Sequence, residues 1–207
     1  MDKELERRGH RFVRYADDCN GYVRSRRAGE RVMQALVDRY AKLRLRINPD
    51  KSAVARAWDR PFLGVSFWVA PGRVIKRRVA PNALTAMKAR VRQITDRTGG
   101  RSLRQVIAEL RSYRTGWRAY FRVADTPGIF ADVDKWLHRR LRMLMLRQWK
   151  RGRTMYRELQ RRGVDGAALG IPAKFGRSWW HVAAHKALPI ALPGTYFESL
   201  GLPRLGR

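Results

Sequence analysis

The chain has 207 residues, of which 44% are apolar, so it is long enough and apolar enough to bury a core. Lys and Arg number 46 against 17 Asp and Glu, giving a net charge of +29 and an isoelectric point near 11.6. Such an excess favours a polyanionic partner, because each neutralised phosphate releases counterions. The alternative is a solvated basic surface without a partner.

The sequence excludes several classes of protein. No apolar run approaches the roughly 20 residues of a membrane-spanning helix, so we expect no membrane partner. The charged start MDKELERRGH differs from a secretory signal or a transit peptide. Cys19 is the single cysteine, which excludes an intramolecular disulfide and a multi-cysteine zinc site and fits a cytoplasmic protein.

The first third of the chain alternates between strand and helix signals. Residues 11–25, RFVRYADDCNGYVRS, predict two short strands joined by a tight turn. Residues 27–46 carry apolar side chains at helical spacing and predict a helix of about 16 residues, which the breakers in INPDKS follow. Residues 60–80 predict a second hairpin around Pro71-Gly72-Arg73.

From Pro81 onward the pattern is helical. We expect a first helix from Pro81 to about residue 97. Ser102 should cap a second helix, which carries a long apolar stripe. A third helix should cover about 127–150, and short helices should follow it. Residues 1–66 hold 16 Lys and Arg against 9 acids, whereas residues 67–207 hold 30 against 8. The sequence thus predicts an α+β fold, two hairpins and a helix followed by an all-α part that carries most of the positive charge.

The acidic pair Asp17 and Asp18 lies on the first predicted turn of this basic chain. Neighbouring carboxylates repel each other unless a cation or strong donors lie opposite. Oxygen ligands suit Mg²⁺, and a pair of such ions about 4 Å apart serves polymerases. The alternative is an ordinary Asp-Asp turn whose carboxylates cap backbone groups.

Four motifs follow one another along the chain: YADD between two strands, INPDKS after a helix, FLGVSF near the second hairpin, and RSLRQVIAELRSYRTGWRAYFR. In order and spacing they resemble group II intron reverse transcriptases/maturases, the first three in the polymerase palm and the last in the thumb or maturase-specific X domain. The resemblance covers nearly the whole chain. It implies the end of a palm over 1–79, a thumb/X domain over 80–160 and a C-terminal helical extension over 161–207.

The resemblance also implies roles for residues of the palm. Asp17 and Asp18 would be catalytic ligands of Mg²⁺, and Lys51 would stabilise charge on, or donate a proton to, the pyrophosphate. An ordinary surface lysine is the alternative for Lys51. Tyr15 and Ala16 would lie beneath the primer end. The primer grip would comprise Phe62, Leu63 and Gly64, with Gly64 allowing close approach of the backbone.

The predicted helix after Ser102 carries arginines within one narrow arc, clear of the apolar stripe: Arg104, Arg111, Arg118 and Arg122. The resemblance implies that this arc binds intron RNA or the template-primer duplex, and that Arg139 and Arg140 on the next helix contribute. Solvated surface is the alternative for each arginine taken singly.

Reverse transcriptases need a third carboxylate, on an apolar strand well upstream of the YADD turn. Only 14 residues precede Tyr15 here, and Asp2 is the sole aspartate among them. We therefore expect the C-terminal half of such an enzyme, with an incomplete Mg²⁺ site and no activity unless a separately encoded N-terminal half completes it. The alternatives are a non-catalytic RNA-binding splicing module and the remnant of a decayed intron reading frame.

Overall fold

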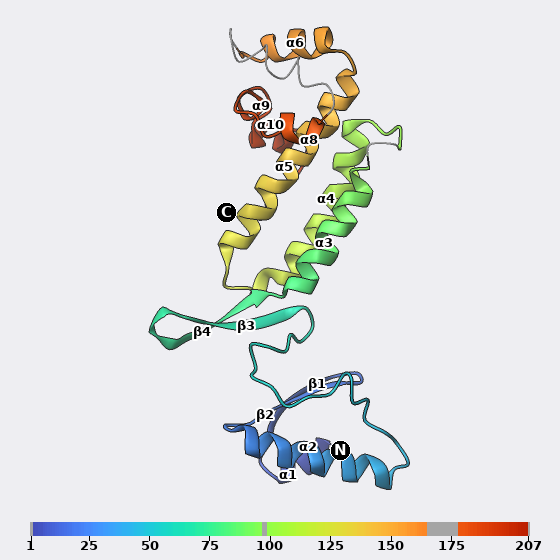
Figure 1. Cartoon of the computed structure of the whole chain (residues 1–207), viewed down its shortest axis with the longest axis vertical. Coiled ribbons are helices and arrows are strands. Elements are labelled where there is room, and N and C mark those ends of the chain that lie inside the picture. The colour runs from blue at the N-terminus through green and yellow to red at the C-terminus, as the bar shows by residue number, and fades with distance from the viewer. Residues whose placement is uncertain (1, 97–98, 165–177, 207) are drawn as a thin grey trace. The chain divides into compact units, whose positions relative to one another are not determined.

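The computed structural model describes residues 2–96, 99–164 and 178–206 (Figure 1). The chain divides into two compact units, Met1–Lys76 and Arg77–Arg207, and each is described by itself. Two hairpins occur among helices, which confirms the predicted α+β class. No described helix combines the length and the apolar character needed to cross a membrane.

The first unit begins with a short helix, a hairpin and a long helix. These are α1 (Asp2–Arg7), β1 (Arg11–Tyr15), β2 (Asp18–Tyr22) and α2 (Arg26–Lys42). Ser25 caps α2, since its hydroxyl accepts a hydrogen bond from the backbone N–H of Ala28 at 3.2 Å. The helix ends at Lys42, before the predicted breakers, and Arg44 just beyond it has a φ of 57°.

The β1–β2 hairpin pairs its strands antiparallel, from Arg11 with Tyr22 to Tyr15 with Asp18. Successive side chains of a strand point to opposite faces. Phe12 and Arg14 are half-buried, whereas Val13 and Tyr15 are exposed. One face of the hairpin therefore packs within the unit, and the face that carries Tyr15 and Asp18 is open.

The second hairpin consists of β3 (Val65–Ala70) and β4 (Val74–Val79), joined by the short 3₁₀ turn η1 (Pro71–Arg73). Gly72 and Arg73 have φ values of 76° and 59°. Glycine adopts this left-handed conformation at little cost, which explains why the chain reverses here. The predicted turn at Pro71-Gly72-Arg73 is confirmed.

Three long helices form the second unit, and Figure 1 shows them side by side. They are α3 (Pro81–Ile94), α4 (Leu103–Tyr120) and α5 (Pro127–Trp149), with η2 (Phe121–Val123) after α4. Proline occupies the first turn of α3 and α5, and Ser102 forms a capping box with Gln105 at the start of α4. The described short helices are α6 (Gly152–Gln160), α8 (Trp179–Val182), α9 (Ala187–Ala191) and α10 (Gly194–Ser199).

The core of this unit lies between the facing stripes of the long helices. Met87, Val91 and Ile94 come from α3, and α4 and α5 add buried residues that include Val106, Ile107, Leu110, Leu137 and Leu141. The predicted apolar stripe of α4 is thus largely confirmed. Tyr120, the last residue that helical spacing places on this stripe, departs from it with a side chain that is 57% exposed, whereas Arg114 is fully buried within the stripe.

Candidate nucleic-acid interface

The arginine arc of α4 lies on the surface of the second unit. Arg104, Arg111 and Arg122 are exposed, and Arg118 is half-buried. Arg104 and Arg118 are 14 residues apart, about 21 Å along a helix. In the part of the chain that the structure describes, Arg104, Arg111 and Arg122 form no ion pair with a carboxylate. Their charges are therefore available to an anion.

The C-terminal segment packs beside two of these arginines. Arg118 donates a hydrogen bond from Nη1 to the carbonyl oxygen of Arg204 at 2.8 Å. A Cβ atom added to Gly201 would lie 3.6 Å from Nη1 of Arg111. Arg204 in turn forms an ion pair with Glu198 on α10. The segment thus fixes the side chain of Arg118 beside the arc.

A buried ion pair holds α4 in place behind this arc. The guanidinium of Arg114, which is fully buried, donates to Oδ1 of Asp134 on α5. Burial lowers the pKa of Arg114 below its ordinary value, and the Asp134 carboxylate opposes that shift. Sequence reasoning missed this pair, although Arg114 is in helical phase with the buried Ile107, Leu110 and Trp117.

Arg139 and Arg140 on α5 have partners within the unit. Arg139 donates two hydrogen bonds, at 3.0 and 2.8 Å, to the carbonyl oxygen of Trp180, and its guanidinium lies 4.0 Å from the centre of that indole ring. Arg140 donates from Nε to the Thr95 hydroxyl at 2.8 Å. These contacts join α8 and the end of α3 to α5, and a role for either arginine in RNA binding stays a prediction.

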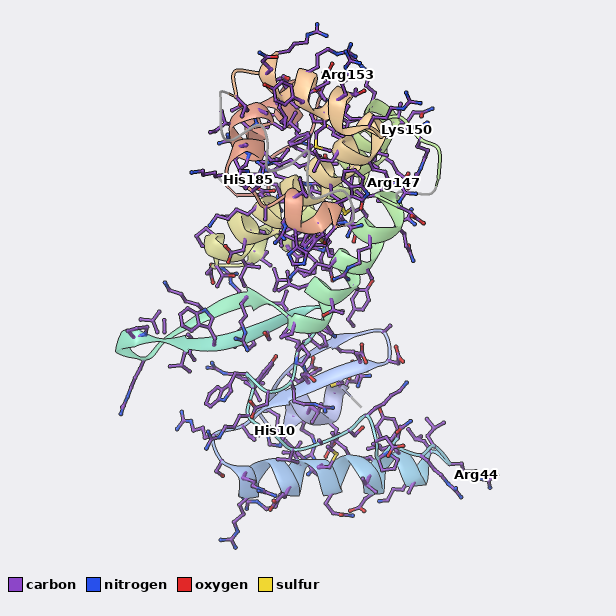
Figure 2. The ribbon with its side chains drawn as sticks, turned by 45° about the horizontal axis from the view of Figure 1, so that its top comes forward. His10, Arg44, Arg147, Lys150, Arg153 and His185 are labelled. Carbon is purple, nitrogen blue, oxygen red and sulfur yellow. The ribbon has the colours of Figure 1, made fainter. Side chains whose placement is uncertain are left out.

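The corner between α5 and α6 is a further basic region that the sequence analysis did not single out (Figure 2). Lys150 has φ 55° and ψ −52°, and the N–H of Arg151 donates to the carbonyl of Trp149 at 2.6 Å. This is the geometry of a γ-turn of the rare, strained kind. The turn exposes Lys150, Arg151 and Arg153 together.

In the first unit, Asp17 and Asp18 lie at the tip of the β1–β2 hairpin, and both are exposed. Ala16 and Asp17 form a two-residue turn between the paired Tyr15 and Asp18, and Ala16 has a φ of 52°. A positive φ at the first turn position alone is typical of a type II′ turn, where glycine is usual. Ala16 therefore carries backbone strain that a glycine at this position would not have.

The Mg²⁺ site predicted at Asp17 and Asp18 stays a prediction. Over residues 2–96, 99–164 and 178–206, no group of three or more His, Cys, Asp or Glu side chains is placed to hold a metal ion. The carboxylate of Asp2 accepts a hydrogen bond from Nε of Arg14 at 2.8 Å. Because Arg14 and Tyr15 alternate along β1, this contact lies on the face of the hairpin opposite to Tyr15 and Asp18.

Two loops hold the remaining predicted palm residues. Lys51 is exposed and follows an Asx turn, in which Oδ1 of Asn48 accepts a hydrogen bond of 2.9 Å from the backbone N–H of Asp50 and a second one of 3.2 Å from that of Lys51. Phe62 and Val65 exchange backbone hydrogen bonds of 2.8 and 3.0 Å across Leu63 and Gly64. These two central residues have φ values of 50° and 72°, which is the type I′ pattern. The roles predicted for them in catalysis and primer binding stay predictions.

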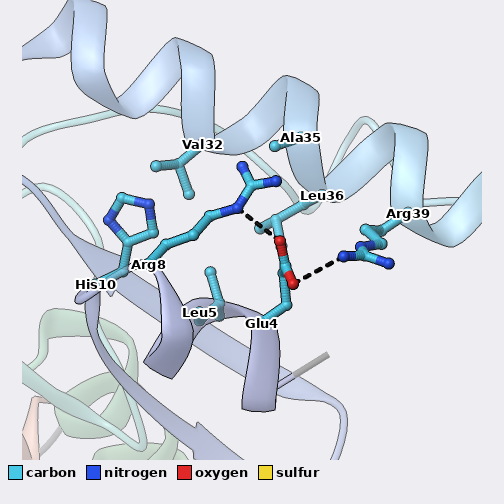
Figure 3. Close-up of a pocket in the computed structure, with 8 residues that line it drawn as sticks. All are labelled: Glu4, Leu5, Arg8, His10, Val32, Ala35, Leu36 and Arg39. Carbon is cyan, nitrogen blue, oxygen red and sulfur yellow. Dashed lines mark hydrogen bonds and ion pairs between the residues drawn. The ribbon is translucent and has the colours of Figure 1, made fainter.

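A small pocket of the first unit lies between α1 and α2 (Figure 3). Glu4 at its edge pairs with Arg8 at 2.7 Å and with Arg39 at 2.8 Å, and also with Arg7 at 2.8 Å. Hydrogen bonds from these arginines, Arg7 foremost, hold the pKa of Glu4 far below its usual range. The apolar side chains of Leu5, Val32 and Leu36 lie beside these ion pairs. The pairs and the apolar contacts together join α1 to α2.

Rigid helices with unpaired arginines on one arc are typical of a nucleic-acid-binding module. Residues 84–163 match the family described as group II intron, maturase-specific domain. The match spans nearly all of α3 and the whole of α4, α5 and α6, and it confirms the resemblance stated for this region. The match supports an intron-related maturase function for this region. No curated protein matches the chain significantly.

Proposed function

We propose that the chain binds group II intron RNA through its helical unit and supports splicing of that RNA, as part of an intron-encoded reverse transcriptase/maturase. One observation carries the proposal: the exposed arginines Arg104 and Arg111 on α4 and Arg122 on η2 have no carboxylate partner among the described residues, and all three lie within the maturase-specific match. The charge of the whole chain, +29, agrees with a polyanionic ligand.

The physical basis of binding is phosphate neutralisation on a rigid helix. Arginine places planar donors against phosphate oxygens, and each contact releases counterions from the RNA. The buried pair of Arg114 and Asp134 keeps α4 in register with α5, so the arc keeps one shape. Such contacts position the RNA without reading its sequence, and recognition of one intron requires contacts to bases or 2′-hydroxyls elsewhere.

The test titrates the full chain into fluorescein-labelled group II intron RNA and, separately, into a DNA duplex and an unrelated structured RNA of equal length. We expect the intron RNA to bind at least tenfold more tightly at 0.15 M salt, and splicing of the intron at low Mg²⁺ to accelerate when the chain is added. Equal affinity for all three nucleic acids, with no change in splicing rate, would rule out the maturase role.

A second candidate is RNA-directed DNA polymerase activity in a complex whose other member supplies a further carboxylate. The open face that carries Tyr15 and Asp18, and the exposure of both aspartates at the turn, support this candidate. Mixing the chain with the N-terminal half of a related enzyme, Mg²⁺ and an RNA template-DNA primer should give extension. The Asp17→Asn variant is the control, and extension that survives this change, or no extension at all, removes the candidate.

A further inference from the structure

Trp136 on α5 lies at the centre of three cations. The centre of its indole ring is 5.8 Å from Nζ of Lys88, 5.6 Å from the guanidinium carbon of Arg92 and 5.6 Å from that of Arg140. Lys88 and Arg92 come from one face of α3, one turn apart, and Arg140 follows Trp136 by one turn of α5. Two helices of the same unit therefore direct positive charge at one half-buried ring.

Two of these cations, Lys88 and Arg92, have no counter-ion among the described residues. Like charges at positions i and i+4 of a helix destabilise it by roughly 0.2–0.5 kcal/mol, and Lys88 and Arg92 have this spacing. Attraction of each cation to the ring offsets the repulsion in part. Within the described ranges, no carboxylate forms an ion pair with Lys88 or Arg92. An anion bound between them would relieve the repulsion.

The framework around the ring is fixed. Nε of Arg140 donates to the Thr95 hydroxyl at 2.8 Å, and that buried hydroxyl donates to the carbonyl of Val91 at 2.6 Å. Arg140 is thus held at the end of α3, whereas Lys88 and Arg92 have no side-chain hydrogen-bond partner in the described part of the chain. These two long side chains are free to move from the ring onto a ligand.

This cluster is distinct from the arginine arc of α4. Trp136 follows Asp134 by two residues, which is about 200° around a helix. Asp134 contacts Arg114 on α4, whereas Trp136 lies beside α3. The helical unit therefore presents a second basic surface on the other side of α5.

We propose that Lys88, Arg92 and Trp136 form a second RNA contact, in which the two cations bind a backbone phosphate and the indole stacks on the base of an unpaired nucleotide. A nucleotide offers both an anion and an aromatic face, and exposed single-stranded bases are what aromatic side chains recognise in RNA. An acidic peptide would satisfy the cations alone. This proposal rests on the proposed function, RNA binding by the helical unit. It adds a second binding site and the part of the nucleotide that each side chain contacts.

The test measures binding of fluorescein-labelled group II intron RNA to the full chain over a range of salt concentrations. In the variant Lys88→Gln/Arg92→Gln, we expect about tenfold weaker binding at 0.1 M salt and a salt slope lower by roughly 0.7–0.9 units, because the contact to one phosphate is lost. In Trp136→Leu, we expect severalfold weaker binding with an unchanged slope, because stacking releases no counterions.

The matched control is Arg27→Gln/Arg31→Gln, which removes the same charge at the same spacing from exposed positions of α2. An equal loss of slope in this control would mean a general charge effect and overturn the proposal. If Lys88→Gln/Arg92→Gln binds RNA as wild type does, the second RNA contact is wrong and the proposed function stands. If the wild-type chain binds no RNA at all, the proposed function itself is wrong. If the Lys88→Gln/Arg92→Gln variant loses binding to poly-glutamate but not to RNA, the partner is an acidic protein and the proposal is wrong.

Discussion

Asp134 on α5 neutralises Arg114 on α4, a guanidinium that is wholly shielded from solvent. The second carboxylate oxygen of Asp134 accepts hydrogen bonds of 3.0 Å from the backbone N–H groups of Leu205 and Gly206. One side chain therefore joins two long helices and the C-terminal segment. Removing one partner of a buried pair leaves the other charge without compensation, which makes this contact a sensitive point of the unit.

We expect Asp134→Ala to lower the free energy of unfolding by about 3–5 kcal/mol, because Arg114 would stay buried and unpaired. Urea denaturation of the full chain, followed by circular dichroism, measures the change. Asp132→Ala is the matched control on the same helix: its side chain is 77% exposed and pairs with the exposed Lys135. The control should change stability by less than about 0.5 kcal/mol. Similar losses in the two variants would contradict the assignment.

The stability of the helical unit should depend on the protonation of His138. Its ring stacks on Phe197 with centroids 5.6 Å apart, and burial lowers its pKa below the ordinary value of 6.5. The nearby charges oppose one another, since Asp134 and Glu198 raise this pKa while Arg142 and Arg114 lower it.

Because the folded pKa lies below the unfolded one, the unfolded chain binds more protons as the pH falls below about 6.5. The contribution of His138 is therefore fully present above pH 6.5 and is lost as the pH falls through its lower folded pKa. Urea midpoints measured from pH 8 to pH 5 should fall more steeply for wild type than for His138→Gln. Parallel profiles would show that His138 does not contribute to the pH dependence.

The arginine arc of α4 should account for several phosphate contacts. In the variant Arg104→Gln/Arg111→Gln/Arg122→Gln, we expect the salt slope of intron RNA binding to fall by roughly 2–3 units, close to one for each lost contact. The thermal midpoint should hardly change, because these side chains are exposed and without carboxylate partners in the described structure. An unaltered salt slope would exclude this arc from the interface.

The turn at Ala16 should respond to substitution according to its backbone conformation. Ala16→Gly relieves the positive φ of 52° and should stabilise the β1–β2 hairpin by up to about 1 kcal/mol. Ala16→Val should act in the opposite direction, since a β-branched residue tolerates this conformation poorly. Amide hydrogen exchange at Val13 and Asn20, which form a hydrogen-bonded pair of the ladder, reports both effects. Faster exchange in Ala16→Gly would contradict the turn assignment.

The long helices and both hairpins could be predicted because their signals are local. Ser102 as N-cap, Pro81 and Pro127 in first turns and Pro71-Gly72-Arg73 at a reversal each determine the structure of a few neighbouring residues. The predicted helix beyond Ser102 and the observed α4 agree for this reason. The maturase-specific resemblance was likewise carried by a continuous stretch and is confirmed over residues 84–163.

Contacts between distant residues were not predictable in the same way. Arg114 lies within the apolar stripe of α4. Asp134 lies on the same face of α5 as Phe130, Leu137 and Leu141, and this position is the one sequence signal that the two charges could meet. The cluster at Trp136 needs the packing of α3 on α5, which a pattern within one helix does not contain. The same limit applies to Asp2, whose pairing with Arg14 depends on how α1 folds against β1.

The bonds from Asp134 to Leu205 and Gly206 also bear on the order of folding. The partners are 71 and 72 residues apart in the chain, whereas Arg114 is only 20 residues from Asp134. Loop closure over the longer distance costs more conformational entropy, so we expect α4 and α5 to pair first and the C-terminal segment to dock last. The last part to dock is expected to be the first to open, and its opening would release the Arg118 side chain from the Arg204 carbonyl.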